Sequence, residues 1–480
     1  MPFIELKQVS KSFTVGLQHI PILQDINFTV EPHEFVVLSG DNGSGKSTLL
    51  NLIVGLLQPS CGSVTLMGRS PKDSLAKTEV GVVLQETSVP NNLTVWELVK
   101  LIRSYYPHPL LAEEVLAKVN LTDKHNTRVS FLSGGQKQRL YFALALAGNP
   151  KLLILDEPTR NLDQEGYREF WKQIQVCREQ GIAILMVTNN QPDGDELKQY
   201  DVRIATLHNL PEAPANGQLT SNPASSLISD SSCNQAHLEL PSPFTLLREQ
   251  IWVELLQLFR TPSFLFGLLL FTAIVAVFPI RGEEAWKVLT LFSSLVTLTF
   301  ALVQLGGRVA IERAEGWLKL LRVTPLPPML YLAAKVCVAL LVCAASLLLI
   351  FGLGIWRLDI NVYPLRWLFL FVALLAGIAP FAIIGLAISY LFSPQSFNSV
   401  AGSLLVAGLL TSGDVPIFSS PFIQNIVAFS PFYHFFQFIH WSADLPNDGR
   451  LLLHLVWLVW TGSMSAFIVT SAYQRDGISS

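Results

Sequence analysis

The residues with the clearest chemical potential form one glycine-rich run, which reads Gly40-Asp41-Asn42-Gly43-Ser44-Gly45-Lys46-Ser47-Thr48. The run follows the apolar segment 35–38 and precedes a helix-like apolar start. The glycines of such a loop let backbone N–H groups converge on phosphates, and the N-terminus of the following helix favours their negative charge. We predict a nucleotide phosphate site in which Lys46 reaches the β and γ phosphates and Ser47 holds Mg²⁺. The residues assigned to nucleotide binding in this loop are Gly40, Asn42, Gly43, Gly45, Lys46, Ser47 and Thr48.

A pair of acidic residues follows a second apolar run, 152–155, so that Asp156 ends the run and Glu157 begins the next turn. Successive strand residues point to opposite faces, and we therefore expect the two carboxylates to have different roles. Asp156 is predicted to enter the Mg²⁺ shell, while Glu157 is predicted to face an attacking water as its base or orienter.

Between these two motifs lies a serine- and glycine-rich segment, Leu132-Ser133-Gly134-Gly135-Gln136, directly before the helix-like run 137–147. A Ser-Gly-Gly helix start is a further place where backbone N–H groups can bind an anion. Three separate segments of this chain are thus suited to phosphate chemistry.

The elements that must position these motifs are visible in residues 1–208. Apolar strand-like runs at 35–38, 152–155 and 182–187 each precede a turn and a helix-like segment, which is typical of a parallel sheet covered by helices. The three motifs, in this order, resemble the ATP-binding cassette of ABC transporters over roughly residues 1–208. The expected fold of this part is an α/β P-loop NTPase with a helical subdomain.

The resemblance implies ATP and Mg²⁺ as cofactors, and it adds further site residues. Phe13 would stack on adenine, Gln85 would sense Mg²⁺ and the membrane domain, and Asp163 would close the dimer. Gln85 thereby joins Ser47 and Asp156 as an expected metal contact.

The resemblance also implies that the chain acts as a homodimer, because two cassettes of this family sandwich ATP between them. Ser133 and Gly135 should then contact the γ phosphate held by the other subunit's Lys46. The nucleotide contacts expected from this segment are Ser133, Gly134, Gly135 and Gln136.

Two departures from the family pattern bear on catalysis. Asn189 occupies the place of the family's switch histidine after the run 182–187. An amide can hydrogen-bond a phosphate oxygen, but it cannot titrate near neutral pH as imidazole does. We expect Asn189 to act with Glu157 and Gln85 in a weakened hydrolytic site. The segment Arg160-Asn161-Leu162-Asp163 also lacks the usual small residues before its Leu-Asp pair.

Composition predicts a second part of the chain that lies in a membrane. Apolar residues make up 50% of the chain and charged residues 14%, whereas soluble domains carry about 25% charged residues. The net charge of −3 gives no reason to expect nucleic acid as a partner. Residues 209–243, rich in Pro, Ser, Asn and Ala, are predicted to be a flexible linker. The remainder, 244–480, is predicted to be an all-α transmembrane permease domain in contact with membrane lipids.

An interfacial helix is expected at 244–260, with an apolar stripe at helical spacing made of Leu247, Ile251, Leu255 and Leu258. Six uncharged runs are each near the length of a membrane span, namely 263–280, 288–307, 336–356, 367–392, 397–413 and 451–472. Three features of the sequence favour one orientation in the membrane. They are the even number of spans, the distribution of Lys and Arg between the predicted sides, and a start without a basic and apolar leader. We expect an integral multi-pass protein of the cytoplasmic membrane, with the cassette and both termini in the cytoplasm.

Two segments between the predicted spans resemble parts of type-two ABC exporter permeases. Residues 311–327, with Glu312-Arg313 and Thr324-Pro325-Leu326, resemble the coupling element that docks onto the cassette near its glutamine loop. An ordinary charged interface loop is the alternative. The outer segment 414–450 resembles the re-entrant helices before the last span.

We interpret the chain as a half-transporter that uses ATP to export an unknown small molecule. Because no charged residue lies within the six predicted spans, a hydrophobic or amphipathic cargo such as a lipid or a drug-like compound is favoured over ion-relay chemistry. The alternatives are a haem or polysaccharide exporter, or an ATP-binding signalling or scaffold membrane protein with little turnover.

Overall fold

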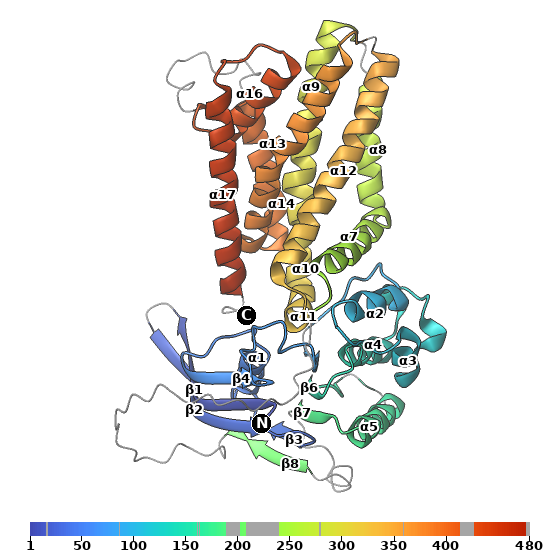
Figure 1. The fold of residues 1–480 in the computed structure, drawn as a ribbon, viewed down its shortest axis with the longest axis vertical. Helices are drawn as coiled ribbons and strands as arrows, with labels where there is room; N and C mark the ends of the chain where they lie inside the picture. Colours follow the sequence, from blue (N-terminus) through green and yellow to red (C-terminus); the bar gives the residue numbers. More distant parts are fainter. Residues whose placement is uncertain are drawn as a thin grey trace, which may run out of the picture. The chain divides into compact units, whose positions relative to one another are not determined.

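The computed structural model describes residues 1–15, 18–85, 87–160, 162, 164–188, 202–207, 240–277, 280–358, 360–412 and 427–476. The chain divides into two compact units (Figure 1). The first unit comprises Met1–Glu249 together with Gly316–Pro328, and the second comprises Gln250–Glu315 and Met329–Ser480. Most of the predicted linker lies outside the described residues.

Two sheets form the first unit. Three antiparallel strands are ordered β2(Gln18–Val30)-β1(Ile4–Val15)-β4(Cys61–Leu66). Five strands with parallel pairing are ordered β5(Val80–Val83)-β6(Leu152–Asp156)-β7(Ala183–Val187)-β3(Phe35–Ser39)-β8(Val202–Thr206). The parallel sheet expected from the sequence is therefore present.

The central strands of the parallel sheet are apolar because both of their faces are covered. All five positions of β3, β6 and β7 are buried, which explains the continuous apolar runs of the sequence. In the register, Asp156 lies opposite Val187, and Val187 lies opposite Leu38. The glycine-rich loop after β3 and the acidic pair at the end of β6 therefore lie at the same edge of the sheet.

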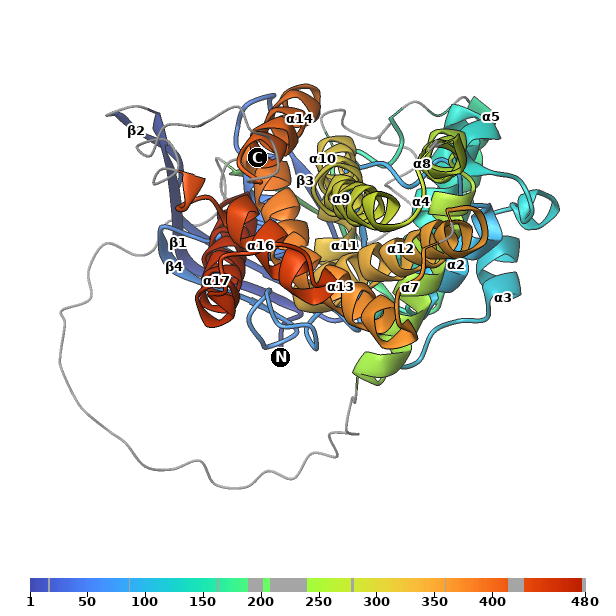
Figure 2. The same ribbon diagram turned by 90° about the horizontal axis from the view of Figure 1, so that it is seen from above.

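Helices complete the first unit. They are α1(Lys46–Ile53), α2(Val95–Arg103), α3(Ala112–Lys118), α4(Gly134–Leu146), α5(Gln164–Glu179) and α11(Trp317–Val323). Helix α2 begins at a capping box, in which Glu97 N donates to Thr94 Oγ1 and Thr94 N donates to the Glu97 carboxylate. Helices α2, α3 and α4 pack on one another and form the predicted helical subdomain (Figures 1 and 2).

The second unit is helical. Its elements are most of α7(Pro243–Phe259), then α8(Pro262–Val277), α9(Glu283–Thr299), a π-helical turn at Phe300–Gln304, α10(Leu305–Glu315), α12(Pro328–Arg357), α13(Pro364–Leu391), α14(Pro394–Leu410), α16(Pro431–Ala443) and α17(Leu451–Asp476). Helices α9 and α10 continue through the π-helical turn, and α13 packs against α10, α16 and α17.

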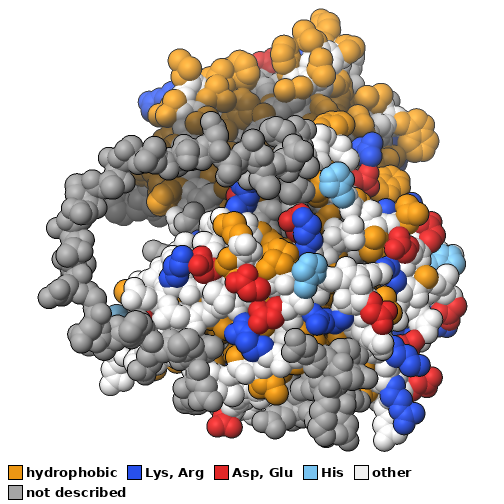
Figure 3. All heavy atoms as spheres, turned by 60° about the horizontal axis from the view of Figure 1, so that its bottom comes forward, with side chains coloured by type: hydrophobic (Ala, Val, Ile, Leu, Met, Phe, Trp, Pro, Cys, Tyr) orange, Lys and Arg blue, Asp and Glu red, His pale blue; other side chains and the backbone are white. Residues whose placement is uncertain are grey.

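Among the described residues, four helices are long and apolar enough to cross a membrane: Glu283–Glu315, Pro328–Arg357, Pro364–Leu391 and Leu451–Ala472. They correspond to four of the six predicted spans. The predicted spans 263–280 and 397–413 correspond to α8 and α14, which have 16 and 17 residues, so a six-helix domain stays a prediction. Figure 3 shows charges of both signs interspersed over the first unit and mostly hydrophobic side chains on the second.

The six predicted spans themselves contain no charged residue, but longer helices that contain two of them do. The helices extend beyond the uncharged runs, so that Arg308 and Glu312 lie in Glu283–Glu315 and Lys335 lies in Pro328–Arg357. The reason is local pairing, since Lys335 Nζ lies 2.6 Å from Glu312 Oε1. Each charge is compensated within the protein, and the helix need not end where the charged residue begins.

Helix α7 buries a polar face as well as an apolar one. Gln250, Glu254 and Gln257 are buried, whereas Ile251 and Leu255 of the predicted apolar stripe remain partly exposed. An apolar face left partly exposed suits an interfacial helix, but the interfacial placement stays a prediction.

The packing of α10 against α13 leads to a stability prediction. A Cβ atom on Gly306 would lie 2.4 Å from Gly385 O and 2.6 Å from Phe397 Cζ, so the two helices approach through small residues. We expect Gly306→Ala to lower the free energy of unfolding by about 1–3 kcal/mol. The measurement is the thermal unfolding midpoint of the purified protein in detergent.

Gly402→Ala is the matched control, because nothing in the structure lies within 4 Å of a Cβ atom at Gly402 of α14. Alanine there should leave the midpoint unchanged or raise it slightly, since alanine has the higher helix propensity. Equal midpoints for the two variants would contradict the close approach.

Candidate nucleotide-binding site

The glycine-rich loop connects the end of β3 to the start of α1. Gly43 and Gly45 have φ values of 83° and 97°, in the left-handed region that favours glycine. Gly45 is also the N-cap of α1, so the loop leads directly into a helix N-terminus. The turn is stabilised by a hydrogen bond of 3.2 Å from Ser44 N to Asp41 O. This backbone can approach a phosphate closely, and the helix end favours its charge.

Lys46 is buried in this loop, with 6% of its surface exposed. Its ammonium group donates to Gly40 O at 2.6 Å and to Asp41 O at 2.8 Å. A lysine ammonium group has three N–H donors, and two of them are directed at carbonyls of its own loop. The loop therefore positions the cation where a phosphate could accept the third N–H. Asn42 on the same loop and Ser47 in the first turn of α1 are exposed.

The acidic pair differs in environment as well as in position. Asp156 is buried at the end of β6, whereas Glu157 adopts a φ of 45°, which is uncommon for a residue other than glycine. Glu157 N donates to Val187 O of the neighbouring strand at 2.9 Å. A strained backbone held by a hydrogen bond of this kind is typical of functional positions.

Gln85 and Glu157 lie together, although they are far apart in the sequence. Gln85 Nε2 donates to Glu157 Oε2 at 2.9 Å, and the exposed Arg160 guanidinium approaches the same carboxylate at 3.6 Å. The structure thus brings together the glutamine that the resemblance added to the site and the acid that was predicted from its place at the strand end. The sequence analysis did not anticipate the contact with Arg160.

The Ser-Gly-Gly segment caps α4. Gln136 N donates to Ser133 Oγ at 3.3 Å, and Ser133 N donates to Gln136 Oε1 at 3.0 Å. The Gln136 side chain is therefore used within the cap, although the sequence analysis assigned it to the nucleotide. Ser133 and Gly134 are exposed, and Cβ positions at Gly134 and Gly135 meet nothing within 4 Å.

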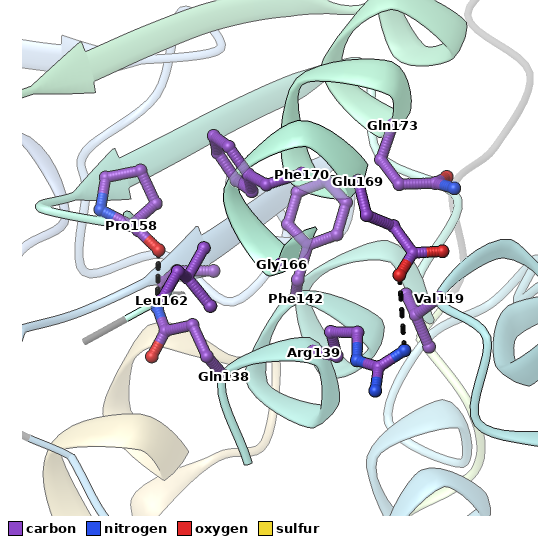
Figure 4. A pocket seen from close by; sticks show the side chains of 11 residues that line it. Val119, Gln138, Arg139, Phe142, Pro158, Leu162, Gly166, Glu169, Phe170 and Gln173 are labelled. Atoms are coloured by element: carbon purple, nitrogen blue, oxygen red, sulfur yellow. Dashed lines mark hydrogen bonds and ion pairs between the residues drawn. The ribbon is translucent and has the colours of Figure 1, made fainter. Parts of the chain in front are cut away.

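A small pocket lies between α4, α5 and the turn after β6 (Figure 4). Gln138 Nε2 crosses from α4 to donate to Pro158 O at 3.0 Å, and Arg139 pairs with Glu169 at 3.3 Å. Gln138 thus connects α4, the helix that begins at the Ser-Gly-Gly segment, to the residue after Glu157. Only its position just beyond the Ser-Gly-Gly segment could have indicated this role.

The remaining predicted site residues that the structure describes make no contact that tests their predicted roles. Phe13 is half-buried on β1, and the Lys11 ammonium lies 5.1 Å from the centre of its ring. Thr48 is half-buried in the first turn of α1. Asp163 and Asn189 lie outside the described residues, and their assignments stay predictions.

The predicted Mg²⁺ contacts have suitable chemistry. Ser47 supplies a hydroxyl, Asp156 a carboxylate and Gln85 an amide oxygen, all of which are the hard oxygen ligands that Mg²⁺ prefers. No group of three or more His, Cys, Asp or Glu side chains able to hold a metal is found among the described residues. A site that shares its ion with substrate phosphates needs only one or two carboxylates.

Comparisons with known proteins agree with this geometry. The ABC transporter family model matches residues 23–160. An uncharacterised ABC transporter ATP-binding protein of Mycobacterium tuberculosis is 33% identical over 243 residues, which cover 47% of this chain and 96% of that protein. The chain belongs to the ABC transporter family, and its first unit is an ATP-binding cassette.

Other relatives carry export in their names. The macrolide export ATP-binding/permease protein MacB of Bdellovibrio bacteriovorus is 34% identical over 45% of this chain and 36% of that protein. The Nod factor export ATP-binding protein I of Rhizobium johnstonii is 34% identical over 40% of this chain and 63% of that protein. The chain thus matches only about a third of the length of this MacB protein.

The position of Lys46 leads to a binding prediction. Lys46→Ala removes a buried charged donor, and a hydrogen bond to a charged group contributes about 1.5–3 kcal/mol. We expect ATP affinity to fall by about 10- to 100-fold, measured with a fluorescent ATP analogue on the purified protein. Lys7→Ala, at an exposed lysine paired with Glu5, is the control and should bind as the wild type does. Unchanged affinity in the Lys46 variant would exclude the proposed phosphate contact.

Proposed function

We propose that this chain is an ABC half-transporter that uses ATP binding and hydrolysis to export a small molecule across the cytoplasmic membrane. The observation that carries the proposal is the presence, in one chain, of a cassette and, among the residues that the structure describes, four membrane-length helices. In the proposed arrangement α8 and α14 complete six spans, and the cassette and both termini lie in the cytoplasm.

The proposed assembly is a homodimer. Ser133 and Gly134 are exposed on the first unit, and the neighbouring Phe131 has 76% of its surface exposed. An exposed anion-binding helix start beside an exposed aromatic ring supports a contact with a second cassette. In that contact, Ser133 and Gly135 would bind the γ phosphate held by the other subunit's Lys46.

The proposed hydrolytic step depends on how Glu157 is held. Its backbone bond to Val187 O and its contact with Gln85 orient the carboxylate at the edge of the sheet, where it would accept a proton from the attacking water. Lys46 and the α1 N-terminus would stabilise the phosphate charge. Mg²⁺ bound at Ser47, Asp156 and Gln85 would neutralise part of the charge on the phosphate oxygens.

A short segment between two membrane helices supports coupling to transport. Residues Gly316–Pro328, which contain α11, belong to the first unit. Lys77 Nζ donates to Arg322 O in the last turn of α11 at 2.5 Å, where a cation also meets the negative end of the helix. Burial and the Arg322 charge lower the pKa of Lys77 to about 8. This segment is our candidate for the coupling element.

The proposed cargo is hydrophobic or amphipathic. Relatives named for macrolide export and Nod factor export support an exporter, and large apolar side chains cover much of the helices of the second unit. A haem or polysaccharide exporter is the alternative within transport. A signalling or scaffold protein that binds ATP with little turnover is the alternative outside it, and steady-state ATPase activity of the purified protein separates these two classes.

The dimer proposal predicts ATP-dependent association. Glu157→Gln should slow hydrolysis, so that ATP accumulates between the two cassettes and stabilises their contact. We expect light scattering to show that the fraction of dimer rises when ATP is added to this variant. Adding Ser133→Arg to the same variant should abolish the ATP effect, because the arginine would obstruct the shared phosphate site. Protein that stays strictly monomeric with ATP would contradict the homodimer.

The proposed place of Asn189 predicts slow turnover with near-normal ATP affinity. Position 189 follows β7, whose Val187 lies opposite Asp156, so its side chain would reach the γ phosphate beside Glu157. Loss of one electrostatic contact to developing charge commonly lowers a rate by about 10²–10³. We expect Asn189→His to raise the ATPase rate, Asn190→His to leave it unchanged and Glu157→Gln to lower it. A rate that does not respond to Asn189→His would show that another group performs the role.

A further inference from the structure

Two buried histidines connect α16 to α17 in the second unit. His434 of α16 and His454 of α17 have 1% and 2% of their surfaces exposed, and their Nδ1 atoms lie 2.8 Å apart. One nitrogen of such a contact must donate and the other must accept, so the pair holds a single proton between its two rings. The contact between these helices therefore depends on how both rings are protonated.

Asp448 determines what the other nitrogen of His454 does. The loop between α16 and α17 places Asp448 Oδ1 2.7 Å from His454 Nε2, and a carboxylate oxygen can only accept. The Tyr433 hydroxyl donates to Asp448 Oδ2 at 3.3 Å, and Asp448 N donates to Gln437 Oε1 at 3.0 Å. His454 Nε2 is thus a donor, and Asp448 attaches the loop to both helices.

His434 has no comparable partner on its other nitrogen. Its Nε2 is buried and makes no hydrogen bond within the described part of the chain. Burial and the His454 charge lower the pKa of His434 to about 4. The Ala428 backbone and Asp448 act in the opposite direction but are weaker. A charge on His454 can be balanced by Asp448, whereas a second charge on His434 is bound poorly while the helices are in contact.

Helices α9, α13 and α14 also pack against α16. Their charged or titratable residues are Glu283, Glu284, Lys287, Arg366 and Tyr390. Lys287 pairs with Glu284 at 2.9 Å, and Arg366 pairs with Asp444 of the loop. The groups that shift the pKa of His434 do not include these residues. Its ring instead stacks on Trp457 of α17, with centroids 4.8 Å apart, and an indole face attracts a charged ring and so limits the shift.

We propose that the histidine pair accepts one positive charge, next to Asp448, and that a second charge, on His434, separates α16 from α17. With both rings charged, two N–H groups face each other across the 2.8 Å contact, and the contact becomes repulsive. In the open arrangement His434 reaches water, where an ordinary histidine binds a proton near pH 6.5. Acid therefore favours opening from about pH 6.5 downwards. The inference lies beyond the proposed function, because it needs neither ATP nor cargo.

The rest of the packing indicates which part opens. Phe435 of α16 is fully buried, and its ring lies 5.3 Å from Phe381 of α13, so α16 is held to α13 by apolar contacts that acid does not change. The opening is therefore expected between α16 and the first turn of α17. The backbone N–H groups of Asp448 and His454 are hydrogen-bonded in the closed arrangement and would become free to exchange.

The test is hydrogen–deuterium exchange of the purified full chain in detergent, without nucleotide, at pH 7 and pH 5. Dividing the chemical exchange rate at each pH by the observed rate gives a protection factor that excludes the intrinsic effect of pH. We expect the protection of residues 444–456 to be about 10- to 20-fold lower at pH 5 and to recover when the pH is returned to 7.

Two variants remove one titrating ring each. His434→Gln keeps an N–H group that can donate to His454 Nδ1 but cannot titrate near neutral pH, so protection at pH 7 should remain and the loss at pH 5 should disappear. His454→Gln should also reduce the loss, because no second charge then develops. His440→Gln, at another buried histidine of α16, is the matched control and should retain the loss seen in the wild type.

An equal loss of protection in the wild type and in both the His434 and His454 variants would overturn the proposal. A parallel loss of protection in β3, β6 and β7 would show that acid unfolds the whole chain, and it would also overturn the proposal. An inactive cassette would contradict the proposed function without affecting these exchange measurements.

Discussion

The hydrogen-bonded register of β6, β7 and β3 determines where Asp156, Glu157 and the start of the glycine-rich loop lie in the first unit. Asp156 is paired with Val187, and Val187 is paired with Leu38, one residue before the end of β3. The same Val187 carbonyl accepts the Glu157 N–H, which holds the glutamate in its uncommon backbone conformation. A shift of one residue in this register would exchange the faces of all the side chains involved.

The second unit depends on a different constraint, the pairing of charge away from water. Buried ion pairs bring little net stability, because desolvation offsets most of the attraction, but removal of one partner leaves a charge that is costly to bury. Glu254, Glu312 and Lys335 come from three helices and depend on one another in this way. The cluster is therefore better understood as a determinant of how these helices are arranged than as a source of stability.

How much could be predicted from the sequence depended on the range of the interaction concerned. The glycine-rich loop, the capped start of α4 and the buried strands arise from neighbouring residues, and their types and spacing predicted them well. The contact of Gln85 with Glu157 joins residues 72 positions apart, and the sequence analysis placed both residues in one site without predicting this contact. The membrane helices are longer than the predicted spans. Each predicted span was ended at a charged residue, and the sequence did not show that Glu312 lies beside Lys335 and compensates its charge. The buried polar face of α7 was missed for the same reason.

The division of the chain into units also has a consequence for biosynthesis. The first unit is not one continuous stretch of sequence, because Gly316–Pro328 returns to it after the helices between Gln250 and Glu315 have been made. A ribosome releases the N-terminus first, so the cassette strands can fold while the later helices are still being synthesised. Lys77 can find the α11 carbonyl of Arg322 only after those helices have left the ribosome. The contact between Lys77 and α11 would therefore form only in chains whose preceding helices have already been synthesised.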